Sequence, residues 1–141
     1  MSDGQVEQLT HEIYNFFNRF VSWETAIIRS SDLTLSESHA IELLGIYGRI
    51  NMKTLADKLA VTRGTVTVTV DRLEKGGYAK RFSIKEDRRT YIIELTPEGQ
   101  KAYEEHHKHH LRLTEELVPL LSDAETETLL RILQKLNADL F

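Results

Sequence analysis

Four of the chain's six histidines lie within five consecutive positions, in the segment "HHKHH" at residues 106 to 110. If this segment is helical, His106 and His110 are four residues apart and lie on the same face of the helix. Two imidazoles at that spacing can bind one metal ion. His107 and His109 would point elsewhere and face solvent. The alternative is a solvated, mildly basic helix face that binds nothing.

A carboxylate in the N-terminal region also needs an explanation. Residues 17, 21, 24 and 28 form one helical stripe, and Glu24 interrupts its apolar side chains. Burying a carboxylate without a partner is costly, so Glu24 requires one. An ion pair with Arg29 would be an ordinary solution. A bound metal ion would be another.

His39 completes a possible ligand set, because it lies just beyond the loop that follows the first helix. Glu24, His39, His106 and His110 together offer one carboxylate and three imidazoles, which is a reasonable tetrahedral zinc site without a thiolate. Nickel and cobalt accept the same ligands. His39 could instead be a helix-capping residue.

The composition limits the class of protein. A chain of 141 residues with 40% hydrophobic residues has the size and core of one domain. It contains no cysteine, which excludes disulfides and thiolate metal sites. Neither a signal peptide nor an apolar run of about 18 residues is present. We therefore expect a cytoplasmic protein without a membrane segment.

The charge is distributed unevenly along the chain, although the formal net charge is only −4. Residues 52 to 90 contain ten Lys or Arg against five Asp or Glu, whereas the remainder contains eight against seventeen. A basic centre between acidic ends is typical of a polyanion-binding region held in a different framework.

Helical spacing predicts the elements on either side of this basic centre. A long amphipathic helix is expected over residues 5–29, and a second one after a cap formed by Ser36 with His39. A short helix follows over residues 52–61. Beyond the centre, a helix that begins with Pro97 should run through the histidines to about residue 121, and a last one should begin at Ser122 or Asp123.

The segment "TVTVTV", residues 65–70, has two possible structures. Its strict alternation of β-branched residues is typical of a strand. As a helix it would place Val66, Val70 and Leu73 on one face, with Thr62 as N-cap and "EKGGY" as terminator. The helix that precedes it after a short turn favours the helical structure.

The order helix, turn, helix and basic hairpin is that of a winged helix-turn-helix. "YAKRFSI" and "RTYIIELT" are strand-like and are separated by the charged turn "KEDR", so they form a hairpin whose tip carries Lys85, Arg88 and Arg89. The second helix would enter the major groove of DNA, and the hairpin the minor groove. The candidate groove contacts on the helix are Thr62, Arg63, Thr65 and Thr67. The alternative is a basic surface that binds no nucleic acid.

The segment from "LADKLAV" to "LTPEG" resembles the core of the MarR family of bacterial transcriptional regulators. The most specific match is Asp87, Arg88 and Arg89 followed by Leu95 and Thr96. The resemblance implies one MarR-like domain over residues 1–141, mainly α-helical with a small β-hairpin wing. Residues 33–99 would form the DNA-binding lobe, and residues 1–32 and 100–141 would interlock in a homodimer. Arg88 and Arg89 would enter the minor groove.

The histidines are similar to those of the zinc-sensing branch of this family, which represses zinc-uptake genes. Glu24, His39, His106 and His110 match its ligand set residue by residue. The branch's second metal position uses a cysteine and a glutamate before the second-helix histidine. This chain has no cysteine, and Ser38 precedes His39, so that only Glu105 remains of the second set.

The resulting hypothesis is a zinc-responsive, sequence-specific repressor that binds a near-palindromic site on double-stranded DNA. The alternative is a MarR-like regulator that responds to a small phenolic or lipophilic ligand. A zinc hydrolase is disfavoured, because four protein ligands leave no position for water. A metal-buffering protein would have no use for a basic wing. We therefore expect no enzymatic activity.

Overall fold

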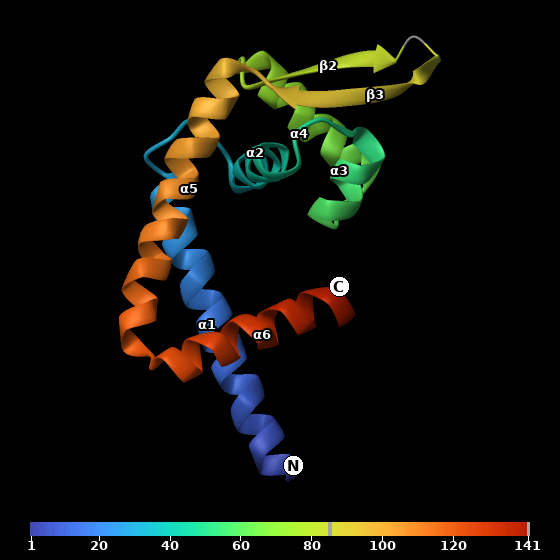
Figure 1. The fold of residues 1–141 in the computed structure, drawn as a ribbon. Coiled ribbons are helices and arrows are strands. Elements are labelled where there is room, and N and C mark those ends of the chain that lie inside the picture. The colour runs from blue at the N-terminus through green and yellow to red at the C-terminus, as the bar shows by residue number, and fades with distance from the viewer. Residues whose placement is uncertain (85, 141) are drawn as a thin grey trace. The chain divides into compact units, whose positions relative to one another are not determined.

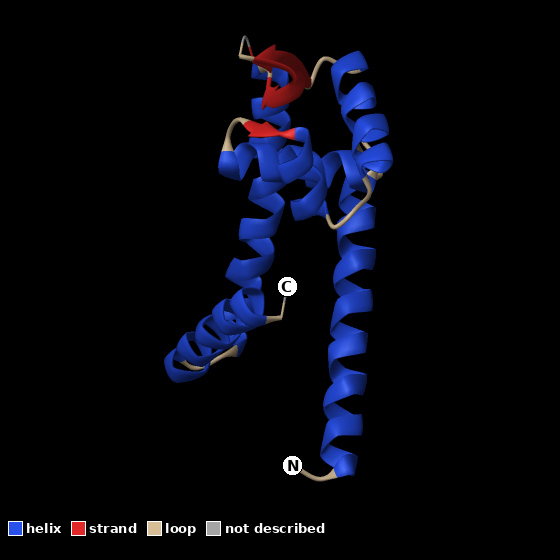
Figure 2. Cartoon of the chain, turned by 90° about the vertical axis from the view of Figure 1, so that its right-hand side faces the viewer, coloured by secondary structure: helices blue, strands red, loops and turns tan. Residues whose placement is uncertain are grey.

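The computed structural model describes residues 1–84 and 86–140 of the chain, and these are mainly helical (Figures 1 and 2). In chain order the elements are α1 (Asp3–Ile28), α2 (Leu35–Tyr47), β1 (Ile50–Asn51), α3 (Met52–Leu59), α4 (Arg63–Lys75), β2 (Ala79–Ile84), β3 (Asp87–Leu95), α5 (Pro97–Leu117), the 3-10 helix η1 (Val118–Leu120) and α6 (Asp123–Asp139). The chain divides into two units, Met1–Glu104 and Glu105–Phe141, and the boundary falls within α5. The predicted fold class, mainly α with a small winged sheet, is confirmed.

Helix α1 begins with a reciprocal cap. The Ser2 side chain accepts a hydrogen bond from the backbone N–H of Gln5, and the Gln5 side chain accepts one from the backbone N–H of Ser2. Towards its end the helix buries Glu24 and Ile28 and packs on α2. Its N-terminal half extends away from α2, α3 and α4 in both views (Figures 1 and 2). Phe17 is accordingly 62% exposed and takes no part in the buried stripe.

Helix α2 begins earlier than the sequence prediction. Its N-cap is Thr34, whose side chain accepts a hydrogen bond from the N–H of Glu37, while the Glu37 carboxylate accepts one from the N–H of Thr34. The prediction of a cap formed by Ser36 with His39 is therefore wrong. A Thr followed by Glu three residues later satisfies two backbone donors at once, which a cap at Ser36 could not do.

The helical prediction for "TVTVTV" is confirmed. The segment lies in α4 with Thr62 as its N-cap, and Val66, Val70 and Leu73 are fully buried. The hydroxyls of Thr67 and Thr69 donate to the carbonyls of Arg63 and Thr65, one turn back. Burial of one valine face against α2 and α3 outweighs the strand preference of β-branched residues.

The sheet has the strand order β1-β3-β2 and is antiparallel throughout. Strand β1 was not predicted, and it pairs Ile50 with Ile93 and Asn51 with Ile92. Strands β2 and β3 form the wing, with Ala79 opposite Leu95 and Ser83 opposite Tyr91. Strand β3 begins at Asp87, two residues before the predicted start.

The hydrophobic core lies where α2, α3 and α4 meet the sheet. Its largest fully buried side chains are Ile41, Leu44, Leu55, Leu73, Ile93, Val66 and Val70. Their contacts join helices to strands that are distant in sequence. The core therefore fixes the start of α4 relative to the wing.

The start of α5 is held against the end of the wing. Thr96 accepts a hydrogen bond from the N–H of Gly99 and donates one to the carbonyl of Gly77, and Pro97 is the first residue of the helix. A Cβ on Gly99 would lie 1.9 Å from the carbonyl oxygen of Tyr78, so only glycine fits there. The "LTPEG" segment thus forms a tight junction between β3 and α5.

The second unit contains the end of α5, then η1 and α6. Helix α5 ends at Leu117, four residues before the predicted end, because Pro119 restricts Val118 and cannot donate a backbone hydrogen bond. Ser122 caps α6 together with Glu125, which confirms the predicted start. Helix α6 leaves a row of apolar residues exposed, namely Leu130, Ile132, Leu133, Leu136 and Leu140.

Candidate nucleic-acid interface and candidate metal ligands

The start of α4 carries the four predicted groove contacts, and all four are exposed. Thr62 accepts a hydrogen bond from the N–H of Thr65 at 3.2 Å, and the two hydroxyl oxygens lie 3.1 Å apart. The hydroxyl of Thr67 donates to the carbonyl of Arg63 at 2.8 Å. The threonines are thereby held in fixed rotamers, while Arg63 projects from the first helical position.

A hollow of about 430 Å³ opens between the start of α4 and the wing. Arg63 and Thr67 line it from α4, and Arg89 lines it from β3. Lys53 of α3 and Arg81 of β2 also line it. Because all of these elements lie in the first unit, the fold brings cationic side chains from four elements to one concave surface. Such a surface suits a polyanion.

Of the three predicted wing residues, the structure describes Arg89 fully, Arg88 in its backbone only, and Lys85 not at all. Arg89 is exposed and lies on strand β3 rather than at the tip of the hairpin, because β3 begins two residues earlier than predicted. The backbone of Arg88 belongs to the same strand, but its side chain lies outside the described part of the structure. Lys85 lies outside the described residues altogether.

Acidic side chains on the sheet are neutralised locally. Glu94 accepts hydrogen bonds from Arg49 Nε at 2.6 Å and Lys80 Nζ at 3.2 Å, and these two cations hold its pKa below the ordinary range. Arg81 pairs with Asp71 and Glu74 of α4. Carboxylates near the wing are thus paired with cations, so that they repel a polyanion less.

Glu24 and His39 meet in the first unit. The Glu24 carboxylate is almost fully buried, and its Oε1 lies 2.7 Å from His39 Nε2. The His39 side chain is 45% exposed. The expectation that a buried Glu24 requires a partner is confirmed, and that partner lies on α2. His39 does not cap the helix, because Thr34 does.

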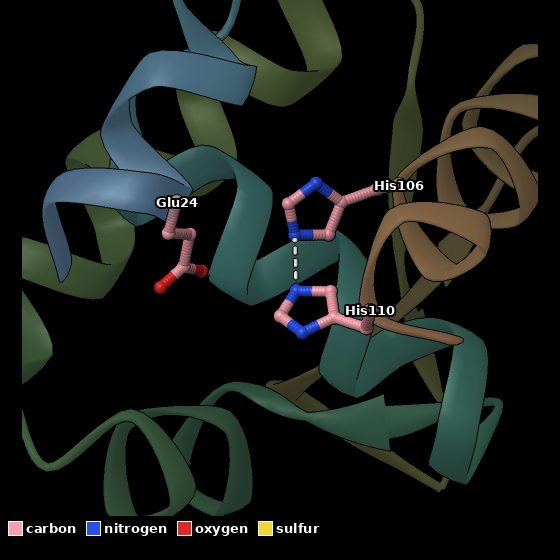
Figure 3. Close-up of side chains that lie close together, drawn as sticks. All are labelled: Glu24, His106 and His110. Carbon is pink, nitrogen blue, oxygen red and sulfur yellow. Dashed lines mark hydrogen bonds between the residues drawn. The ribbon is translucent and has the colours of Figure 1, made fainter. Parts of the chain in front are cut away.

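His106 and His110 meet in the second unit. Their Nε2 atoms are 3.0 Å apart, and the ring planes are inclined at 66° (Figure 3). One imidazole must donate and the other accept for this hydrogen bond to form. All four histidines of the cluster are of intermediate exposure, so burial does not separate His107 and His109 from the pair as predicted.

Each pair fits the donor chemistry of a metal ion. Two ligands about 2.0 to 2.1 Å from one tetrahedral ion lie about 3.3 Å from each other. The observed separations of 3.0 Å and 2.7 Å are slightly shorter, as expected for atoms that share a proton. Small side-chain rotations would open either pair enough for an ion. The second metal position of the zinc-sensing branch has no such support, since Ser38 is buried in α2 where that branch has a carboxylate.

Sequence reasoning missed Lys53 and Arg81 as parts of the basic hollow. Lys53 lies in the first turn of the helix that precedes α4, and this position could have indicated that it belongs to the basic surface. No local pattern distinguishes Arg81 from its neighbour Lys80, because its role depends on tertiary contacts with α4.

The sequence model of the MarR family matches residues 33–91. The uncharacterized HTH-type transcriptional regulator YfiV of Bacillus subtilis strain 168 is 32% identical over 97 residues, which is 68% of this chain and 60% of YfiV. This chain thus spans less than two thirds of the length of that curated relative.

Solved structures match over nearly the whole chain. The structure of Streptococcus pneumoniae FabT in complex with DNA has a TM-score of 0.87 at 26% identity and covers 96% of each chain. A MarR family protein from Bacillus stearothermophilus has a TM-score of 0.88 at 22% identity, over 99% of this chain and 98% of that one. No helix among the described residues is long and apolar enough to cross a membrane.

The matched residues 33–91 include α4, the basic hollow and most of the wing, and they overlap the segment from "LADKLAV" to "LTPEG". Over this segment the chain is similar to the MarR family of transcriptional regulators.

Proposed function

We propose that the protein is a sequence-specific transcriptional repressor that binds double-stranded DNA as a homodimer and responds to zinc. The observation that supports DNA binding best is the basic hollow between the start of α4 and the wing. Arg63 lies at the first position of α4, from which a side chain can reach base edges in the major groove. Arg89 lies on the wing, where it would enter the minor groove. FabT, 26% identical to this chain, has been solved in complex with DNA.

The homodimer is supported by the terminal helices. In the single chain α1 exposes large apolar residues along its N-terminal half, including Ile13, Phe16 and Phe17, and α6 exposes its leucines. Exposed apolar area of this kind is typical of an interface that a second copy covers. A two-fold dimer would present two α4 helices, which predicts a near-palindromic operator with half-sites one helical turn apart.

Zinc is proposed as the effector on the basis of the two side-chain pairs. Glu24 and His39 supply a carboxylate and an imidazole, and His106 and His110 supply two imidazoles that converge at Nε2. Bound zinc would act as a cross-link among α1, α2 and α5, four ligands being its usual number in a non-catalytic site. It would then favour one arrangement of the DNA-binding lobes over others.

A titration of the full-length protein tests both parts of the proposal. Operator binding is measured with a chelator and then with graded zinc, and zinc affinity is measured by calorimetry. His106→Ala should weaken zinc binding by more than about 100-fold, because it removes a ligand rather than a supporting group. The matched control is His107→Ala, on the next position of the same helix turn. Zinc binding should also weaken as the pH falls, because protons compete with zinc for the imidazole nitrogens.

Each outcome has a distinct meaning. Equal losses in His106→Ala and His107→Ala would identify a nonspecific surface chelator and refute the four-residue site. Tight zinc binding without any change in operator affinity would refute the regulatory role. A protein that binds no duplex at any zinc concentration would refute the DNA-binding function itself.

A further inference from the structure

Arg81 is the side chain of β2 that connects the wing to the recognition helix. Its Nη2 donates to Oδ1 of Asp71, and its Nε lies 2.7 Å from Oε1 of Glu74. Asp71 and Glu74 are three residues apart on α4 and therefore share one face of it. The guanidinium carbon also lies 5.9 Å from the ring centroid of Tyr91 on β3. One side chain of β2 thus contacts both α4 and β3.

The positive charge of Arg81 is already paired with carboxylates of the same chain. Arg81 lines the basic hollow together with Arg63 and Arg89, and its position alone would make it a candidate phosphate contact. Two carboxylates, however, already surround its guanidinium, which is only 28% exposed. The cluster of Arg81, Asp71 and Glu74 carries a formal charge of −1 and adds nothing to the attraction of DNA.

The contact geometry requires an arginine. A planar guanidinium can donate from Nε and Nη2 to two separate carboxylates while its face lies near an aromatic ring. A lysine ammonium at the same place has one nitrogen, and its flexible stem cannot hold two helix carboxylates in fixed directions. The arrangement therefore fixes an orientation and does not merely balance charge.

We propose that Arg81 is a positioning residue that holds the β2–β3 wing at a fixed angle to α4, so that both can enter their DNA grooves together. This inference rests on the proposed DNA-binding function. Two binding elements that are already fixed relative to each other lose little conformational freedom on association, whereas a loosened wing must be ordered at that step. Breaking the cluster should thus weaken DNA binding, even where the change makes the surface more positive.

The decisive variant is the double substitution Asp71→Asn with Glu74→Gln, which removes two negative charges from the interface. Operator affinity of the full-length protein is measured at several salt concentrations. Removing acidic groups from a DNA-binding surface ordinarily increases affinity. We expect instead a loss of about five- to ten-fold, with the salt dependence unchanged. Binding to nonspecific duplex, which needs no fixed geometry, should be affected less.

Arg81→Lys is the second variant, because it keeps the positive charge and removes the planar guanidinium that donates to two carboxylates. It should lose a similar factor in operator affinity, again with an unchanged salt slope. Asp57→Asn is the matched control, since it removes an exposed acid from α3 of the same lobe without touching Arg81. This control should leave the affinity unchanged or slightly increased. Circular dichroism melts confirm that each variant is folded.

The opposite result would overturn the inference. If Asp71→Asn with Glu74→Gln binds the operator more tightly and steepens the salt slope by about 0.9, Arg81 has been released to contact a phosphate. Near-native affinity in Arg81→Lys would likewise show that only its charge matters. Either result leaves the proposed function standing, whereas failure of the unmodified protein to bind duplex DNA would refute that function first.

Discussion

The proposed DNA-binding lobe, residues 33–99, and the terminal helices of this chain use apolar residues in opposite ways. In the lobe, α2, α3 and α4 each contribute fully buried aliphatic side chains to one core, as Leu73 at 0% exposure illustrates. In the terminal helices, comparable side chains stay open to solvent, with Phe16 at 64% and Leu133 at 48%. The lobe therefore completes its core within one chain. The terminal helices have amphipathic sequences whose apolar faces need a partner.

This difference divides the stability of the protein into a local and an intermolecular part. Contacts inside the lobe are made once the chain has folded, at any protein concentration. In the proposed dimer, contacts of the α1 and α6 faces with a second copy would depend on mass action. Substitutions in the lobe should thus change the free energy of unfolding, whereas substitutions on the exposed faces of α1 and α6 should change self-association.

The largest expected effect comes from a cavity in the lobe. Leu73→Ala removes a fully buried side chain from α4, where it packs between α2, α3 and the sheet. The free energy of unfolding should fall by about 3 kcal/mol, within the usual range for a leucine truncation in a core. Urea denaturation followed by circular dichroism measures this loss. A loss below about 1 kcal/mol would mean that the lobe is not the rigid core described above.

A smaller effect, on self-association, is expected for a substitution in α6. Leu133→Asp places a charge on the exposed apolar row and should weaken self-association by about 30-fold, or about 2 kcal/mol. Sedimentation at several protein concentrations measures the shift. Ala138→Asp, which adds the same charge five residues further along and on the other side of the helix, should leave self-association unchanged. Equal effects in both variants would argue against this face as the interface.

The sequence was informative where several local rules agreed. The valine stripe of "TVTVTV" matched a threonine cap and a glycine terminator, and α4 has those features. The junction at Thr96, Pro97 and Gly99 was likewise visible as a helix start. The cap at Thr34 was missed because Ser36 is an equally good cap by composition, and only the reciprocal bond with Glu37 decides between them.

Features made by tertiary contacts were not accessible in this way. Strand β1 consists of Ile50 and Asn51, and it is a strand only because β3 lies beside it. The link between Arg81 and α4 joins residues ten positions apart through the geometry of the wing. Among the proposed ligands, the i, i+4 spacing predicted the approach of His106 and His110, and helical periodicity predicted the burial of Glu24. The direct contact of Glu24 with His39 required the packing of α1 on α2.

The smallest effects concern two carboxylates, the partly buried Glu94 in the lobe and the exposed Glu125 at the start of α6. Both have a pKa below the ordinary value of 4.5, for different reasons. Arg49 and Lys80 lower the pKa of Glu94 through hydrogen bonds. The backbone N–H of Ser122, and then its hydroxyl, do so for Glu125. Because protonation is harder in the folded state, each group contributes stability above about pH 4.5 and loses it as the pH falls through the lowered pKa.

Salt should distinguish the two contributions. Ionic screening acts over about 3 Å at 1 M salt, so it weakens the exposed pairs of Glu94 with Arg49 and Lys80. The cap at Glu125 depends on hydrogen bonds to Ser122, which salt affects less. The thermal midpoints of Glu94→Gln and Glu125→Gln should each lie below that of the unmodified protein at pH 7, and each difference should shrink as the pH falls below 4.5. Added salt should shrink the deficit of Glu94→Gln and leave that of Glu125→Gln nearly unchanged. A larger salt response in Glu125→Gln would contradict the assignment of the two causes, because a helix cap would then behave as an ion pair.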